Sequence, residues 1–149
     1  MLRLELVGGG GMHGSSCDNS KDFQRWFECL PFSAASICVD RATLLAGHGR
    51  LKVNLGFIIE ASEAEKNGLY AGRYAQWLSA RRCLHGIVRG SDDEPADPAR
   101  FFPALDKLNA LGLSLSGDPF TRMIGSYDVG DGLLRYDEAW FPIDEMMSR

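Results

Sequence analysis

The chain has 149 residues, of which 45% are hydrophobic and 24% charged, so it is long enough for one domain with a hydrophobic core. Its net charge of -4 and pI near 5.3 argue against a nucleic-acid-binding surface, and Arg81 and Arg82, the one adjacent basic pair, are expected in a solvated loop. No window holds the roughly 18 apolar residues of a membrane span. The N-terminal apolar run is too short for a signal peptide, so we expect a cytoplasmic protein.

The first part of the chain predicts a strand, a helix and a hairpin. Residues 2–7 alternate between apolar and polar, as in a strand. A helix is expected from about Asp18 to Pro31, because large apolar residues recur there at helical spacing: Phe23, Trp26, Phe27 and Leu30. Residues 35–60 are then predicted to form two strands joined at Gly47-His48-Gly49.

The second part predicts the same order of elements. The polar residues 61–68 form a connector, residues 72–79 a strand, and residues 89–98 a loop. Asp97 and Pro98 mark a helix start and Gly112 its end, with an apolar face of Phe101, Phe102, Leu105, Leu108 and Leu111. Residues 120–129 and 133–143 flank an Asp-Gly turn and are expected to form a hairpin.

The two expected hairpins align without gaps. When Gly47 is set on Gly130, residues 47–57 lie over residues 130–140 with three identities and several similar pairs. We therefore predict an α+β fold, one domain spanning residues 1–149. It would contain two βαββ repeats, about 1–60 and 70–146, related by a pseudo-two-fold axis, with antiparallel sheets and a central ligand groove.

Two stretches carry a family resemblance. "AGRYAQW" (residues 71–77) and "DEAWFPI" (residues 137–143) resemble the GyrI-like small-molecule-binding domains, which also serve as effector-binding domains of multidrug-sensing transcription activators. The resemblance implies tandem βαββ repeats and a lipophilic cation held by aromatic residues around an acid. Other members hydrolyse cyclopropanoid compounds or modulate DNA gyrase. Thr121 departs from the family, whose members often have an acid there, and so does the stretch from Arg81 to Ala96.

Glu138 is the leading candidate for a binding residue. In a strand it shares a face with Leu134, Tyr136 and Trp140, and the matching residue of the first repeat is the apolar Leu55. A carboxylate among rings needs a cation to compensate it, and a lipophilic cation would also gain cation–π attraction of about 0.5–2 kcal/mol per ring. The alternative is a surface acid, solvated or paired with an arginine of the hairpin, Arg122 or Arg135.

The predicted function is non-catalytic binding of a small lipophilic cation. The ligand-binding residues are expected to be Glu138, Tyr136 and Trp140, followed by Tyr74, Trp77 and Phe57. One alternative is a hydrolase of a strained-ring compound that uses Glu138 as base, with the hydroxyl of Tyr136 or Tyr74 holding the reacting group. Another is a protein-interaction module, such as a topoisomerase modulator, which an exposed apolar patch without an enclosed groove would favour.

Other possible sites are weaker. Gly9, Gly11 and Gly14 match a dinucleotide fingerprint on paper, but no parallel strand follows, so a loop is expected. His13 and Cys17 are read as loop residues, and His48 and Asp131 as exposed turn residues. The helix aromatics are assigned to the core.

The expected partners are few. The cysteines, with no C-x-x-C pair, are read as free thiols rather than a zinc site: Cys17, Cys29, Cys38 and Cys83. We expect no metal, no cofactor, no membrane contact and no direct nucleic-acid binding. A whole transcription activator is not expected, because no helix-turn-helix segment precedes the domain. A homodimer or a separate regulatory partner stays open.

Overall fold

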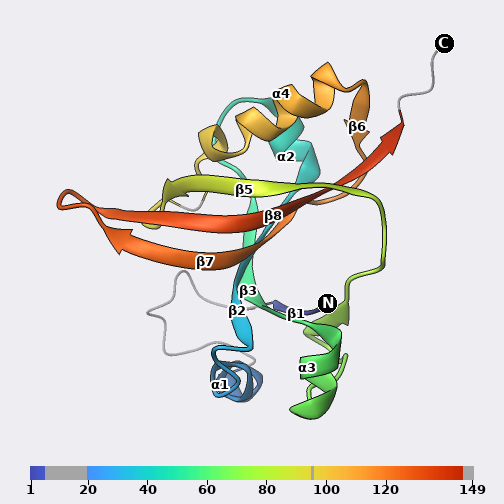
Figure 1. The fold of residues 1–149 in the computed structure, drawn as a ribbon, viewed down its shortest axis with the longest axis vertical. Coiled ribbons are helices and arrows are strands. Elements are labelled where there is room, and N and C mark those ends of the chain that lie inside the picture. Colours follow the sequence, from blue (N-terminus) through green and yellow to red (C-terminus); the bar gives the residue numbers. More distant parts are fainter. Residues whose placement is uncertain (6–19, 95, 146–149) are drawn as a thin grey trace. The chain divides into compact units, whose positions relative to one another are not determined.

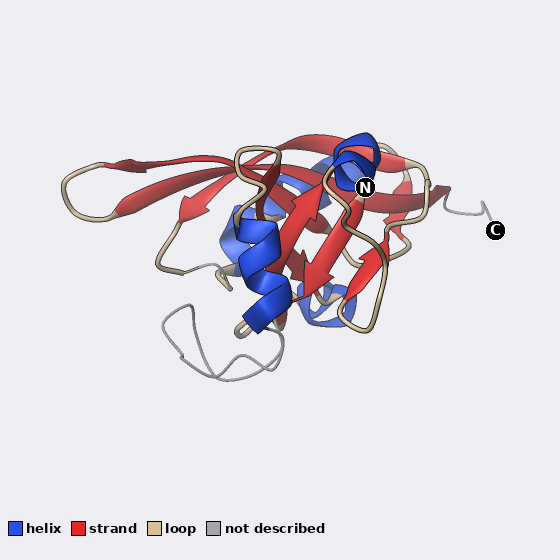
Figure 2. Cartoon of the chain, turned by 90° about the horizontal axis from the view of Figure 1, so that it is seen from below, coloured by secondary structure: helices blue, strands red, loops and turns tan. Residues whose placement is uncertain are grey.

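A computed structural model describes residues 1–5, 20–94 and 96–145. These residues form an α+β fold with an eight-stranded antiparallel sheet and four short α-helices (Figures 1 and 2), which confirms the α+β class and the antiparallel strands of the prediction. None of the described helices is long and apolar enough to cross a membrane. The chain divides into two compact units: unit 1 comprises Met1–Ser36 and Asn54–Ser79, and unit 2 comprises Ile37–Val53 and Ala80–Arg149. Strands β2 (Ser33–Val39) and β3 (Val53–Ile59) contribute residues to both units.

Unit 1 is built on the short strand β1 (Leu2–Glu5). This strand pairs with β3 on one side and with β4 (Ala75–Trp77) on the other. Helix α1 (Ser20–Phe27) adds Trp26 to the core, as its helical spacing predicts, whereas Phe27 is exposed. The buried cluster that holds the unit together contains Leu2, Leu4, Trp26, Phe57, Ile59, Ala64, Leu69 and Ala75.

Unit 2 is dominated by a long hairpin, drawn in orange and red in Figure 1. Its strands are β7 (Phe120–Asp128) and β8 (Leu133–Glu145), joined at the predicted Asp-Gly turn. Strand β5 (Cys83–Ser91) pairs along the other edge of β8, and β6 (Leu113–Leu115) pairs with the end of β8. A 3-10 turn, η1 (Pro98–Arg100), precedes helix α4 (Phe102–Ala110).

The predicted start of the second helix is partly confirmed. The Asp97 carboxylate accepts a hydrogen bond from the Ala99 N–H (2.9 Å), and Pro98 follows as predicted. This cap opens the 3-10 turn, however, and the α-helix proper begins at Phe102. Phe101 is fully buried and packs edge-on against Phe141 (ring centroids 6.3 Å apart), while Phe102 is exposed and thus not the core residue that was expected.

The predicted hairpin over residues 35–60 is wrong in its turn. Helix α2 (Arg41–Ala46) lies between β2 and β3, because Asp40 caps it through the Thr43 N–H (2.8 Å) and the segment that follows is rich in alanine and leucine. Gly47 ends this helix in the left-handed conformation (φ 70°). Residues 61–68, expected to be a connector, form helix α3 (Ala61–Lys66), which buries Ala64.

Strand β5 was not predicted, and it includes the first three residues of the loop expected over residues 89–98. Its alternation is broken by Gly86 and Gly90, which are poor strand formers. Gly90 has a packing reason: a Cβ there would lie 3.0 Å from Nε of the buried Arg100. The fourth strand is shorter than the predicted 72–79, and β6 was not predicted.

Candidate functional site

The residues around Glu138 come from three adjacent strands of unit 2. Because strand side chains alternate, one face of β8 carries Leu134, Tyr136, Glu138 and Trp140. The strand register sets Ile87 of β5 and Arg122 of β7 opposite Glu138. It likewise sets His85 and Phe120 opposite Trp140. The hairpin turn and its register therefore assemble this cluster from residues far apart in the sequence.

Both carboxylate oxygens of Glu138 have partners within the protein. Its Oε2 accepts hydrogen bonds from Nε (2.9 Å) and from Nη2 of Arg122, and its Oε1 lies 2.9 Å from Nε2 of His85. The side chains of Glu138, Arg122 and His85 are 21%, 34% and 52% exposed, so the cluster is accessible from solvent. Of the two arginines considered as partners from the sequence, Arg122 is the one that pairs with Glu138.

Three rings stack across the strands beside this ion cluster. The Trp140 ring lies between His85 (centroids 5.1 Å apart, interplanar angle 21°) and Phe120 (5.2 Å, 14°). Cζ of Arg122 lies 5.7 Å from the Trp140 ring centroid, so the same guanidinium contacts the carboxylate and the indole. A guanidinium is a flat, delocalised cation that stacks on aromatic faces, and this location suits such a group.

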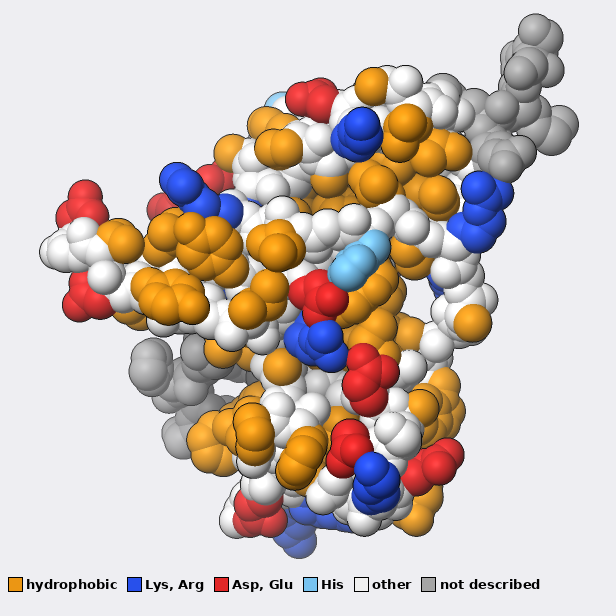
Figure 3. All heavy atoms as spheres, in the orientation of Figure 1, with side chains coloured by type: hydrophobic (Ala, Val, Ile, Leu, Met, Phe, Trp, Pro, Cys, Tyr) orange, Lys and Arg blue, Asp and Glu red, His pale blue; other side chains and the backbone are white. Residues whose placement is uncertain are grey.

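An apolar surface adjoins the cluster. Three large hydrophobic side chains of β5 and β7 are exposed: Ile87, which is the register partner of Glu138, Tyr127, which is the register partner of Leu134, and Ile124. Tyr136 contacts Tyr127 edge-on, with ring centroids 6.0 Å apart. Figure 3 shows hydrophobic side chains gathered over these strands, next to acidic, basic and histidine side chains. A ligand with an apolar body and a polar head would find both kinds of contact on this face.

The opposite face of the same strands carries a buried ion network. Asp137 is fully buried and accepts hydrogen bonds from Arg100 and from Arg135 (2.7–2.9 Å), while Arg135 also reaches Asp92 (3.2 Å). Burial lowers the pKa of Arg100, and the neighbouring Asp137 opposes that shift. Neither Nε nor Nη1 of Arg100 has a hydrogen-bond partner within the described part of the chain. These residues hold the sheet from inside rather than facing a ligand.

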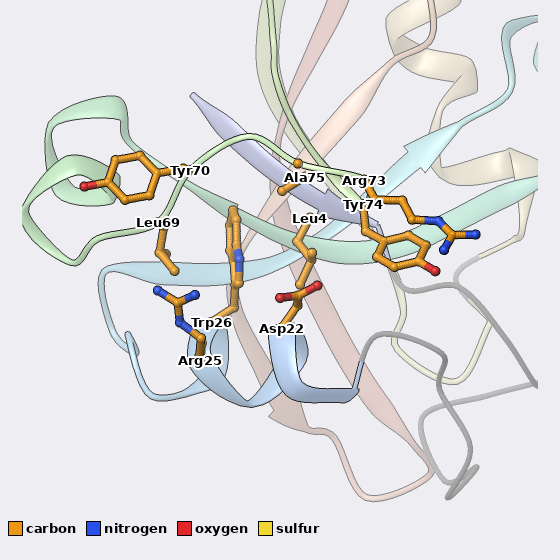
Figure 4. A pocket seen from close by; sticks show the side chains of 10 residues that line it. Leu4, Asp22, Arg25, Trp26, Leu69, Tyr70, Arg73, Tyr74 and Ala75 are labelled. Atoms are coloured by element: carbon orange, nitrogen blue, oxygen red, sulfur yellow. The ribbon is translucent and has the colours of Figure 1, made fainter.

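The other three predicted residues belong to unit 1. Phe57 is buried in the core and packs edge-on against Phe23 (5.4 Å). Trp77 is exposed at the end of β4. Tyr74 is half-buried against the core, has the Arg73 guanidinium over its ring (5.1 Å), and lines a small cavity (Figure 4). The structure thus gathers Glu138, Tyr136 and Trp140 in unit 2, and Tyr74 at a cavity of unit 1.

Two members of the cluster were missed from the sequence. His85 could not be assigned to the Glu138 face because its strand was not recognised, and Phe120 was not singled out from its hairpin. His48 and Asp131 are exposed, as predicted, and the three described cysteines are free thiols. His13, Cys17 and the glycines from Gly9 to Gly14 lie outside the described residues. Within the described ranges, no group of three or more His, Cys, Asp or Glu side chains is arranged to hold a metal ion.

Comparison of the chain with protein-family models, curated proteins and solved structures finds no match. The resemblance to GyrI-like domains therefore stays a prediction that rests on the two sequence stretches.

Proposed function

We propose that the face of unit 2 around Glu138 binds a lipophilic organic cation, which replaces Arg122 at the carboxylate. One observation carries the proposal: the Arg122 guanidinium is held by Glu138 and lies over Trp140. The guanidinium of Arg122 thus lies between Glu138 and Trp140, where the positive charge of the ligand was predicted to bind. A location that stabilises a guanidinium in this way offers the same contacts to another planar or delocalised cation.

The energies permit this exchange. An ion pair as exposed as Arg122–Glu138 contributes about 0–1 kcal/mol, and an exposed cation–π contact about 0.5–1 kcal/mol. A ligand recovers both contacts when it displaces the side chain. In addition it covers apolar surface of Ile87, Ile124 and Tyr127, which is favourable by roughly 25 cal/mol per Å². The apolar body of the ligand is therefore the source of net affinity.

We extend the proposal to the tandem βαββ architecture with a central groove that the family resemblance implies. The aligned glycines do not support it, because Gly47 ends helix α2 whereas Gly130 lies in the β7–β8 turn. Support comes instead from the strand order of the sheet, in which β1, β3 and β2 of the expected first repeat are followed by β7, β8 and β5 of the second, the reverse order of the corresponding strands.

A protein-interaction module is the second candidate, favoured by an exposed apolar strip that consists of Ile87, Ile124 and Tyr127. The hydrolase alternative gains less support, because both oxygens of Glu138 are already engaged by His85 and Arg122. A carboxylate held in this way is poorly placed to take a proton from a substrate.

Isothermal titration with tetraphenylphosphonium tests the proposal. Glu138→Gln should bind this cation more weakly than the wild type, by up to about fivefold, since it loses the carboxylate that attracts the positive charge of the ligand. Glu65→Gln, an exposed acid on α3, is the matched control and should bind like the wild type. Equal affinity of Glu138→Gln and the wild type would overturn the proposal. Binding of a protein partner to the apolar strip, without any binding of the cation, would favour the second candidate.

A further inference from the structure

Unit 1 contains a cavity of about 70 Å³ that the function proposed for unit 2 does not involve. Its apolar walls come from buried core residues: Leu4, Trp26, Leu69 and Ala75. Asp22, Arg25, Tyr70, Arg73 and Tyr74 complete the lining, and Figure 4 shows how their side chains lie. A single water needs only about 10–15 Å³ of such volume, so the cavity can admit a group of several heavy atoms.

The cavity walls are fixed by backbone contacts. Trp26 is held in the core cluster by its place on α1. The Glu5 N–H donates to the Tyr74 carbonyl (2.9 Å), so the backbone before β4 follows β1 past the cavity. A turn closes the segment, with the Gly72 N–H donating to the Ala75 carbonyl (2.8 Å). The apolar part of the recess is therefore formed by packed residues, whereas the charged side chains that line it, including Asp22 and Arg25, are exposed to solvent.

Charges of both signs lie at the cavity without neutralising each other. Asp22 and Arg25 are three residues apart on α1, which places them on neighbouring positions of the helix surface. Figure 4 shows their side chains on either side of Trp26 in this view. Arg25 donates from Nη2 to the Gly68 carbonyl (2.8 Å), whereas Asp22 has no hydrogen bond or ion pair among the described residues. An acid such as Asp22 is favoured in the first turn of a helix by the helix dipole, but the dipole does not explain why a cavity lies beside this acid.

We propose that this cavity binds a small zwitterion of the α-amino acid class. The ligand's ammonium group would pair with Asp22, and its carboxylate would accept from the N–H groups of Arg25 that the Gly68 carbonyl leaves available. A short aliphatic side chain would contact Leu4, Trp26 and Ala75. An organic cation would pair with Asp22 but offer no negative charge to Arg25, and an anion would pair with Arg25 but offer no positive charge to Asp22. A ligand with both charges satisfies both groups.

Calorimetric titration with L-alanine and L-valine tests this proposal, together with the shift of the Trp26 indole N–H signal in ¹⁵N spectra. Ethylamine and propionate each carry one of the two charges and should bind at least about tenfold more weakly. Asp22→Asn and Arg25→Gln should each weaken amino acid binding by a similar factor. Arg25→Lys keeps the positive charge but lacks the guanidinium that donates to the Gly68 carbonyl, and it should retain part of the affinity. Comparison with Arg25→Gln then separates the effect of the charge from the effect of the Gly68 contact.

Lys21→Gln, an exposed residue on the same helix, and Glu65→Gln on α3 are the controls and should leave amino acid binding unchanged. The proposal is overturned if the wild type binds neither amino acid, or if ethylamine or propionate binds as tightly as L-alanine. Asp22→Asn should also bind tetraphenylphosphonium like the wild type, so the two sites are tested independently.

Discussion

Asp137 and Glu138 are adjacent in the sequence, yet their substitutions should differ sharply in cost. Asp137→Asn removes the charge that compensates Arg100 and Arg135, which are both buried. Breaking a buried ion network by removing one partner costs about 3–5 kcal/mol, because an uncompensated buried charge remains. Glu138→Gln breaks pairs that solvent already screens, and it should cost about 0–1 kcal/mol.

Urea unfolding monitored by circular dichroism measures both free energies, and thermal unfolding gives a second reading. In a chain of this size, 1 kcal/mol corresponds to about 2–4 °C in the melting temperature, so Asp137→Asn should lower it by about 6–20 °C. Arg100→Met in the Asp137→Asn background should recover part of the loss, since it removes an unpaired buried guanidinium. A loss below about 1 kcal/mol in Asp137→Asn, or equal losses in the two single variants, would refute the assignment of the two faces.

The remaining predictions concern other elements. Gly56→Ala should destabilise unit 1 by about 1–3 kcal/mol or more in urea unfolding, because its Cβ would lie 1.9 Å from the Leu4 carbonyl oxygen. Gly86→Ala is the control, because a Cβ at Gly86 would have no atom within 4 Å, and it should change the free energy of unfolding by no more than about 0.5 kcal/mol. Equal losses of stability in Gly56→Ala and Gly86→Ala would contradict the β1–β3 register. Asp40→Ala should cost about 1 kcal/mol by removing the cap of α2, whereas no change would argue against the cap. Burial raises the pKa of the Cys83 thiol, so less thiolate is present at pH 8 and iodoacetamide should modify it more slowly in the folded protein than after unfolding. Equal rates would contradict that burial.

Local signals were sufficient to predict part of the fold. The Asp-Gly turn between two alternating stretches predicted the β7–β8 hairpin, and the helical spacing that includes Trp26 predicted α1. These elements are encoded by turn chemistry and periodicity within a few residues. The class of the fold followed from them.

Other elements depend on tertiary contacts that the sequence pattern does not contain. Position 90 of strand β5 is a glycine because the side chain of Arg100 packs against it. This contact between distant residues interrupts the alternation of apolar and polar residues from which a strand is predicted. Helices α2 and α3 have six residues each, too few for a visible apolar stripe.

The candidate site shows the same division. Alternation in β8 placed Glu138 beside Tyr136 and Trp140, and Arg122 was considered as a partner from its position in the hairpin. His85 required knowledge of β5, and the stack of His85, Trp140 and Phe120 required the register of three strands. The residues on the predicted strand could thus be found from the sequence, while their partners across the sheet could not.

The affinity of Arg122→Gln for tetraphenylphosphonium, measured against the wild type, tests the central proposal most directly. Arg122 occupies the place at Glu138 that a ligand cation would take, so its removal eliminates an internal competitor. Since a ligand must displace an exposed ion pair of about 0–1 kcal/mol and a cation–π contact of about 0.5–1 kcal/mol, Arg122→Gln should bind the cation about 2- to 30-fold more tightly than the wild type. Unchanged or weaker binding by Arg122→Gln would contradict the proposal that a ligand replaces Arg122 at Glu138.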